Sequence, residues 1–226
     1  MSITKNVLTV RKRIEEAAQK SGRSPETITL VAVTKNQPLS AVLEVVSAGV
    51  TDIGENRSQE LIPKQAAAGK GINWHFIGHL QRNKVRYIIP YVYLIQSVDS
   101  RALAQEISMR AKAIGKTQDI LLEVNTSEEP SKHGFAPRDI VSAAQDIEGL
   151  ANIRVKGLMT MAPFTEDTAV LKSHFAKTKE IFDNLTSKQG EKLDMRYLSM
   201  GMTNDFEIAI EHGANMVRIG TALFTP

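Results

Sequence analysis

The sequence predicts an α/β protein, a single (β/α)₈ barrel (TIM barrel) preceded by one extra helix. Short apolar or β-branched segments alternate with amphipathic segments from residue 29 onward, as in parallel βα units. About eight such strands are expected in 226 residues, which favours a closed barrel over an open doubly wound sheet. No composition shift marks a second domain, so residues 1–226 are expected to form one domain.

The elements follow from hydrophobic spacing and from the residues that stop each helix. Apolar residues recur at helical spacing between Met1 and Lys20, so the chain begins with an amphipathic helix that Ser21-Gly22 ends. Glycines end several of the later helices. Strands are expected at 29–33, 51–54, 74–77, 92–96, 119–124, 153–159, 197–200 and 216–219, and helices at 39–48, 58–68, 81–89, 101–114, 138–147, 167–188 and 204–211, with no helix after the last strand.

Composition excludes several classes of function. Hydrophobic residues make up 42% of the chain and charged residues 23%, as in an ordinary globular protein with a sizeable core. A net charge of +3 is too weak to indicate a nucleic-acid-binding protein. The absence of cysteine excludes disulfides, thiolate nucleophiles and sulfur-ligated metals. The charged N-terminal segment does not resemble a secretory signal and no apolar run is long enough to span a membrane, so a cytoplasmic protein is expected.

Lys35 is the first residue that points to chemistry. It ends the segment Thr29–Lys35, whose first five residues have the composition of a strand buried on both faces. Taken alone, a lysine at a strand end is most often simply solvated. The other interpretation is an amine in a partly desolvated pocket that forms a Schiff base with a carbonyl. The rest of the chain favours this second interpretation.

Two glycine-containing turns follow the last two expected strands and favour a phosphate site. Ser199-Met200-Gly201 and Gly220-Thr221 each combine a hydroxyl with a glycine, which lets backbone N–H groups approach phosphate oxygens. Barrels of this kind frequently hold phosphate in the loops after strands seven and eight. Each glycine alone would be read as an ordinary turn residue, but two such turns at neighbouring strand ends favour phosphate.

A rim lysine and a phosphate site together indicate a phosphorylated carbonyl ligand. Pyridoxal phosphate fits, because its aldehyde reacts with lysine and its phosphate needs an anchor. Arg218 adds a third feature, since an arginine beside the pyridine nitrogen has no proton to transfer and leaves the ring a weaker electron sink. An ordinary rim salt bridge is the alternative role for Arg218.

Six segments carry a resemblance to a known protein family: Val31–Lys35, Gly54–Asn56, His75–Gln81, Gly157–Pro163, Leu198–Met202 and Val217–Thr221. Together they resemble the YggS/PROSC family of pyridoxal-phosphate homeostasis proteins. The resemblance runs from about Ile28 to the C-terminus, and the combination of motifs is highly specific. One departure is Thr203, where the family pattern leads us to expect serine; the hydroxyl is kept.

The resemblance implies a fold similar to the N-terminal barrel of bacterial alanine racemase, a type III barrel that binds pyridoxal phosphate (PLP). It also implies that the cofactor forms an imine with Lys35 and that Arg218 faces the pyridine nitrogen. Met200 is expected to wall the pocket. By the same resemblance, phosphate would be held by Ser199, Gly201, Gly220 and Thr221, and the ring would be lined by Asn56 and Ile77.

Three functions follow as hypotheses. The leading one is a non-catalytic, monomeric carrier that binds PLP, limits its free concentration and delivers it to PLP-dependent apo-enzymes. The second is an amino-acid racemase, and the third is a class I aldolase whose lysine takes a sugar phosphate. Racemisation needs acid/base groups on both faces of the cofactor. Lys35 could serve one face, but racemases of this type take the other group from a second domain, which is not expected here.

Other motifs carry less weight. His75 and His79 lie four residues apart, but Gly78 and the strand context exclude a helical metal pair, so no metal site is expected. No Walker A or GxGxxG motif occurs, so nucleotide binding has no support. A basic patch is interpreted first as a solvated helix face and second as an anion or partner surface; it consists of Arg82, Lys84 and Arg86, with Tyr87, Tyr91 and Tyr93 nearby.

Overall fold

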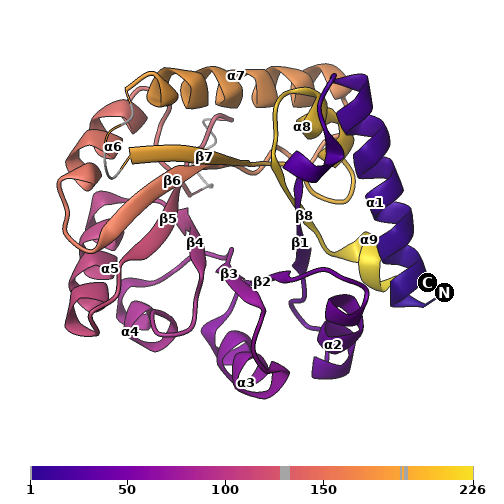
Figure 1. The fold of residues 1–226 in the computed structure, drawn as a ribbon. Helices are drawn as coiled ribbons and strands as arrows, with labels where there is room; N and C mark the ends of the chain where they lie inside the picture. The colour runs from indigo at the N-terminus through magenta and orange to yellow at the C-terminus, as the bar shows by residue number, and fades with distance from the viewer. Residues whose placement is uncertain (1, 128–132, 189, 191–192, 226) are drawn as a thin grey trace.

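The computed structural model is a closed barrel of parallel strands with helices around it (Figure 1). It describes residues 2–127, 133–188, 190 and 193–225. Each strand pairs with the next along the chain and β8 closes on β1, so the carboxyl ends of the strands meet at one rim. The strands are β1 (Thr29–Val33), β2 (Asp52–Glu55), β3 (Asn73–Phe76), β4 (Leu94–Val98), β5 (Gln118–Glu123), β6 (Ile153–Met159), β7 (Leu193–Ser199) and β8 (Met216–Ile219).

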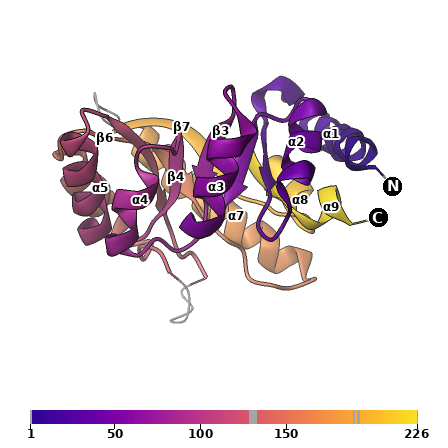
Figure 2. The same ribbon diagram turned by 90° about the horizontal axis from the view of Figure 1, so that it is seen from below.

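Helices cover the outside of the barrel, and the extra N-terminal helix lies beside the last ones. Figures 1 and 2 show the first helix next to the C-terminal elements, with the two ends of the chain close together. Within the described ranges, no helix is both long and apolar enough to cross a bilayer. The helices are α1 (Ile3–Lys20), α2 (Leu39–Ser47), α3 (Ser58–Ala68), α4 (Val85–Ile88), α5 (Arg101–Ala113), α6 (Ile140–Glu148), α7 (Thr168–Thr186), α8 (Phe206–Glu211) and α9 (Thr221–Phe224), with 3₁₀ turns at Pro25–Thr27 and Arg82–Lys84.

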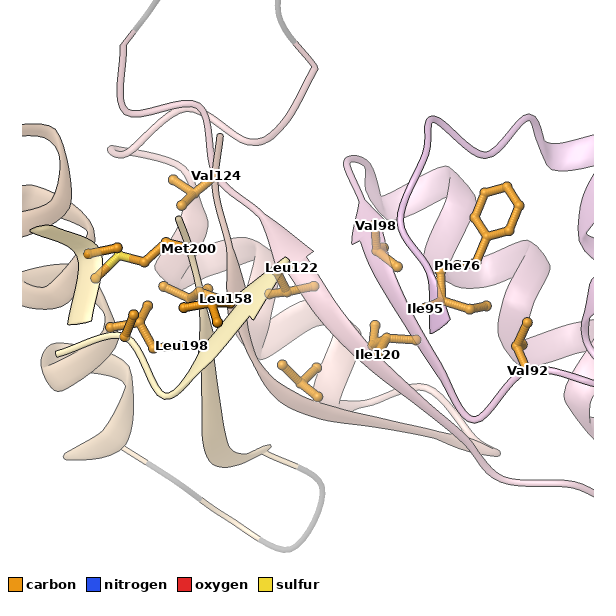
Figure 3. Close-up of a cluster of buried hydrophobic side chains, with 14 of the residues drawn as sticks. Phe76, Val92, Ile95, Val98, Ile120, Leu122, Val124, Leu158, Leu198 and Met200 are labelled. Atoms are coloured by element: carbon orange, nitrogen blue, oxygen red, sulfur yellow. The ribbon is translucent and has the colours of Figure 1, made fainter. Parts of the chain in front are cut away.

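Buried side chains form one layer outside the barrel wall and a second inside it. Successive strand residues point to opposite faces, which divides each strand between the two layers. Ile120, Leu122 and Val124 belong to the large cluster that includes the buried helix residues, and Figure 3 shows part of it. The smaller interior cluster consists of Val31, Leu94, Leu121, Met159 and Met216, with Tyr197 against it.

The structure confirms the predicted fold class and corrects three elements. Residues 81–89 do not form one basic helix, because the side chains at 81–83 are exposed and only one α-helical turn, α4, follows the 3₁₀ turn. β7 begins at Leu193 rather than 197, with buried Leu193 and Met195 alternating with charged residues that mask the pattern. The chain after β8 does form a helix, α9, which at four residues is too short to show helical periodicity.

Candidate functional site

Lys35 lies just past the carboxyl end of β1, in the turn to α2. Its side chain is exposed, so the partly desolvated pocket expected from the sequence is not what the structure has. β1 pairs with β8 in a register that sets Ala32 opposite Ile219, and this brings the turn after β8 beside the turn that holds Lys35. The amine is therefore at the rim, next to the glycine turn that was expected to bind phosphate.

The peptide groups on both sides of Lys35 are held by side chains of β2 and α3. Lys64 Nζ donates to the Thr34 carbonyl at 2.8 Å and to Glu55 Oε1 at 2.6 Å, and Thr34 Oγ1 donates to the same Glu55 oxygen at 2.6 Å. Glu60 Oε2 accepts from the Asn36 N–H at 2.7 Å and from Lys64 Nζ at 3.3 Å. We call Thr34, Glu55, Glu60 and Lys64 the Lys64 clamp. It fixes the backbone of the turn while leaving the Lys35 side chain free.

Glu55 is the most deeply buried member of the clamp. Its side chain is fully buried, and burial raises its pKa although Lys64 and Thr34 act in the opposite direction. Its second oxygen, Oε2, has no hydrogen-bond partner among the described residues. Lys64 is therefore the partner on which the charged form of Glu55 depends.

Two glycines bring Asn56 and Ile77 together beside the barrel mouth. A Cβ at Gly78 would lie 2.5 Å from the Asn56 carbonyl oxygen, so the two turns can meet this closely only with glycine. A Cβ at Gly54 would lie 3.0 Å from Ile77 Cδ1, so the Ile77 side chain lies over Gly54. Asn56 Oδ1 is buried and accepts no hydrogen bond from the described residues, which leaves an acceptor for a ligand.

Arg218 is buried in the mouth of the barrel, with 4% of its surface exposed. Its Nη1 donates to Ser199 Oγ at 2.6 Å and its Nη2 to the Thr160 carbonyl at 2.8 Å. Burial lowers its pKa to about 10, against the opposing effect of the Glu123 and Asp205 carboxylates, so the guanidinium stays charged at neutral pH. An ordinary rim salt bridge, the alternative role considered for Arg218, does not describe this side chain.

Ser199 lies inside the barrel wall rather than at an open turn. Its hydroxyl accepts from Arg218 and donates to Gln96 Oε1 at 2.7 Å, and the residue is fully buried. A phosphate contact by this hydroxyl would have to replace one of these bonds. The neighbouring Met200 side chain packs in the core (Figure 3), so its backbone is the part that can reach the rim.

The turns after β7 and β8 offer backbone donors. The N–H groups of Gly201, Gly220 and Thr221 donate no hydrogen bond within the described part of the chain. Gly201 has a φ of +93°, and a Cβ there would lie 2.7 Å from Ala209 Cβ, so this turn requires glycine. Thr203 Oγ1 lies 3.4 Å from the Ala222 N–H, which sets its hydroxyl beside the second turn. Thr203 was noted in the sequence only as a departure and was not assigned to the site.

A second set of ionisable side chains at the rim was missed by the sequence analysis. Burial raises the pKa of Glu123 to about 7, Asp99 raises it further and Arg218 opposes the rise. Asp99 Oδ2 lies 3.1 Å from His79 Nδ1 and 3.7 Å from His133 Nδ1, and the two rings stack with centroids 3.9 Å apart. His75, four residues before His79, is buried and hydrogen bonds elsewhere, to Asp52 and Gln96.

Comparisons with known proteins identify the family of this chain. The family model described as alanine racemase, N-terminal domain, matches residues 6–226. A Pyridoxal phosphate homeostasis protein from Pseudomonas aeruginosa is 42% identical, covering 99% of this chain and 95% of that protein. PipY of Synechococcus elongatus, solved with PLP bound, is 32% identical with a TM-score of 0.86, covering 99% of this chain and all of that chain (100%). An alanine racemase from Clostridium difficile shares the fold at 17% identity, with a TM-score of 0.78, covering 99% of this chain and 55% of that one. The chain therefore belongs to the family of pyridoxal phosphate homeostasis proteins.

Proposed function

We propose that this protein binds PLP at the barrel rim, holds it as a Schiff base on Lys35, and buffers or delivers it without significant catalytic turnover. One observation carries the proposal: an exposed lysine, a buried arginine and backbone N–H groups that are unpaired among the described residues lie at the same rim. A phosphorylated aldehyde with a pyridine ring needs these three features. The PLP-bound PipY structure and the naming of the curated relatives support the same cofactor.

The residues present fit the cofactor. When bound, PLP supplies an aldehyde that reacts with amines and a ring that withdraws electrons. In this proposal Lys35 Nζ supplies the covalent link and Arg218 donates to the pyridine nitrogen. The ring would lie against Asn56, Ile77 and the backbone of Met200, with Asn56 Oδ1 available to a polar group. Phosphate is bound by the N–H groups of Gly201, Gly220 and Thr221, by the Thr221 and Thr203 hydroxyls, and by Ser199 if its hydroxyl turns from Gln96.

The carrier role follows from what Arg218 can and cannot do. A guanidinium with two hydrogen bonds to the protein and a pKa of about 10 remains charged and transfers no proton at neutral pH. Arg218 would therefore leave the pyridine nitrogen of a bound cofactor unprotonated, and the ring would then stabilise negative charge on an amino-acid substrate poorly. An exposed Lys35 is also accessible to an incoming amine or apo-enzyme. The proposal is completed by a cytoplasmic monomer that passes PLP to PLP-dependent apo-enzymes.

The link to Lys35 can be tested directly. The purified protein, loaded with PLP, should absorb in the visible range, and borohydride should fix the cofactor on the peptide that contains Lys35. Lys35→Ala should lose both signals, while Lys70→Ala, a change at an exposed lysine in the turn after α3, should keep them. Fixation on another lysine, or no visible band, would contradict the assignment and favour the aldolase hypothesis.

Racemase activity is the second candidate, and Glu123 is the observation in its favour. A buried carboxyl with a pKa of about 7 near Arg218 is a group that can exchange a proton at neutral pH. Holo-protein should be incubated with single L-amino acids in deuterated water while the α-proton is followed by NMR. We expect exchange far below ordinary enzymatic rates of roughly 1–10³ s⁻¹. Exchange at such rates, abolished by Glu123→Gln, would make the protein a racemase-like enzyme.

A further inference from the structure

A chain of buried polar side chains runs through the interior of the barrel from the rim towards its opposite end. From Arg218 on β8 it passes to Ser199 on β7 at 2.6 Å, and from Ser199 to Gln96 on β4 at 2.7 Å. Gln96 Nε2 lies 2.9 Å from His75 Nδ1 on β3, and His75 Nε2 lies 3.0 Å from Asp52 Oδ1 at the start of β2. Ser199, Gln96 and His75 are each at most 1% exposed.

The chemistry of these groups fixes the direction of every hydrogen bond in the chain. Arginine has only donors, so Ser199 Oγ accepts from Arg218 and gives its own proton to Gln96 Oε1. The Gln96 amide must then turn its NH₂ group to His75, whose Nδ1 accepts. This assigns the proton of a neutral His75 to Nε2, from which it is donated to the Asp52 carboxylate. Burial alone would raise the pKa of Asp52, but His75, Asn73 and Thr51 hold it below its ordinary value, so the chain ends on an ionised acceptor.

Packing of the barrel does not require this chain. The interior of such barrels is normally filled by branched apolar side chains, and here Leu94, on the same strand as Gln96, follows that rule. Polar side chains buried among them cost free energy unless all their groups are paired. Here the buried hydroxyl, amide and imidazole are each hydrogen bonded on both sides.

We propose that Gln96 and His75 are positioning residues for Arg218: with Ser199 and Asp52 they form a one-directional hydrogen-bond chain that holds the guanidinium towards the cofactor ring. The inference rests on the proposed function in that Arg218 donates to the pyridine nitrogen. Only Nη1 depends on the chain, because Nη2 is bonded separately to the Thr160 carbonyl. Breaking the chain should therefore release one side of the guanidinium and leave the other anchored.

Three variants of the full-length protein and a matched control test the chain. Gln96→Met keeps the length of the side chain but gives Ser199 no acceptor oxygen and His75 no donor. Gln96→Glu restores an acceptor for Ser199 and is compatible with a protonated His75. Ser199→Ala removes the link next to Arg218 with little change in volume, and carries the test if Gln96→Met does not fold. Leu94→Met is the control, since it changes the shape of an interior side chain on the same strand without touching the chain.

The first measurement uses cofactor-free protein, so it does not depend on the proposed function. In ¹H–¹⁵N NMR spectra the Arg218 Nη groups, assigned by their loss in Arg218→Lys, should show hindered rotation in the wild type. Gln96→Met and Ser199→Ala should lose the Nη1 signal by fast exchange, while Gln96→Glu and Leu94→Met should retain it. The second measurement is an equilibrium titration with PLP. Affinity should fall about ten- to a hundredfold in Gln96→Met, as for the loss of one hydrogen bond to a charged group. Ser199→Ala also removes a proposed phosphate contact, so for that variant only the guanidinium signals report on the chain.

Urea unfolding of the same proteins separates positioning from stability. If Gln96→Met and Ser199→Ala are less stable but keep the guanidinium signals and PLP affinity of Leu94→Met, the chain only stabilises the barrel and the inference is wrong. If the wild type binds no PLP, the proposed function fails, and the guanidinium signals alone decide whether the chain holds Arg218.

Discussion

Lys64→Met is the perturbation for which the structure gives the most definite expectation. Methionine matches the lysine stem in length, so the change mainly removes the ammonium group from the Lys64 clamp. Glu55 then keeps one hydrogen bond, from Thr34 Oγ1, and its fully buried carboxylate loses Lys64, the only cation that pairs with it among the described residues. Breaking a buried ion pair by removing one partner costs about 3–5 kcal/mol, because a buried charge is left uncompensated. We expect a loss of this size in the free energy of unfolding.

The dependence on pH separates this mechanism from simple loss of packing. Burial already raises the pKa of Glu55 above its ordinary value, and losing Lys64 should raise it further. A carboxyl whose pKa is raised in the fold favours the folded state most at low pH, and this contribution is lost as pH rises through the folded pKa. The cost of Lys64→Met should therefore be smaller at pH 5 than at pH 8.

Urea unfolding at both pH values provides the measurement, with the free energy taken from the midpoint and the slope. Lys70→Met is the control, because Lys70 is exposed. The double variant Lys64→Met/Glu55→Gln should recover most of the loss, since a neutral amide removes the buried charge and still accepts from Thr34. A loss in Lys64→Met no larger than in Lys70→Met, or one that does not change with pH, would refute the assigned role of the clamp.

Two further predictions concern the barrel wall and its mouth. In the urea assay, Gly157→Ala should destabilise the protein by more than about 4 kcal/mol, because the new Cβ would overlap the Tyr197 carbonyl oxygen. Gly71→Ala is the control: φ is +90° there but no atom lies within 4 Å of the new Cβ, so the cost should be only about 1–2 kcal/mol. Glu123→Gln should stabilise the protein at pH 8 by at most about 3 kcal/mol, because a pKa of about 7 means that the charged carboxylate opposes folding above that pH. The gain should disappear below about pH 4.5. Thermal unfolding of Glu123→Gln and the wild type at a series of pH values tests this, and a difference in stability that does not change with pH would contradict it.

The fold could be predicted from the sequence because the signal is local and repeated. A run such as Thr29–Val33 is read as a buried strand from its own composition, and regular alternation then predicts the barrel. The sequence also singled out Lys35 and Arg218 as candidates, because Lys35 directly follows a buried strand and Arg218 interrupts one. Elements without internal periodicity were missed: the four residues of α9 cannot show a helical repeat.

The side chains that position Arg218 and the turn at Lys35 could not be predicted from the sequence, for a different reason. Gln96 and Ser199 lie 103 positions apart in the chain, so their contact exists only once the barrel closes. Whether a strand residue faces inward also depends on register, and a shift by one residue exchanges the two faces. Gln96 therefore had the appearance of an ordinary strand glutamine, and Lys64 that of a solvated lysine on a helix. The partners of both are set by topology rather than by neighbouring sequence.

The Lys64 clamp and the hydrogen-bond chain lie on opposite sides of the barrel wall, because successive side chains of a strand point to opposite faces. On β2, Asp52 faces the interior and belongs to the chain, whereas Glu55, three residues later, faces α3 and belongs to the clamp. The clamp acts on the backbone around Lys35 from outside, and the chain acts on the Arg218 side chain from inside. β1 and β8 are paired, with Val31 opposite Arg218, so the strands that carry these two residues are neighbours in the wall. Among the described residues the clamp and the chain share no side chain. Neighbouring strands of a parallel barrel thus carry an amine and a guanidinium towards the same rim while the two positions are set independently.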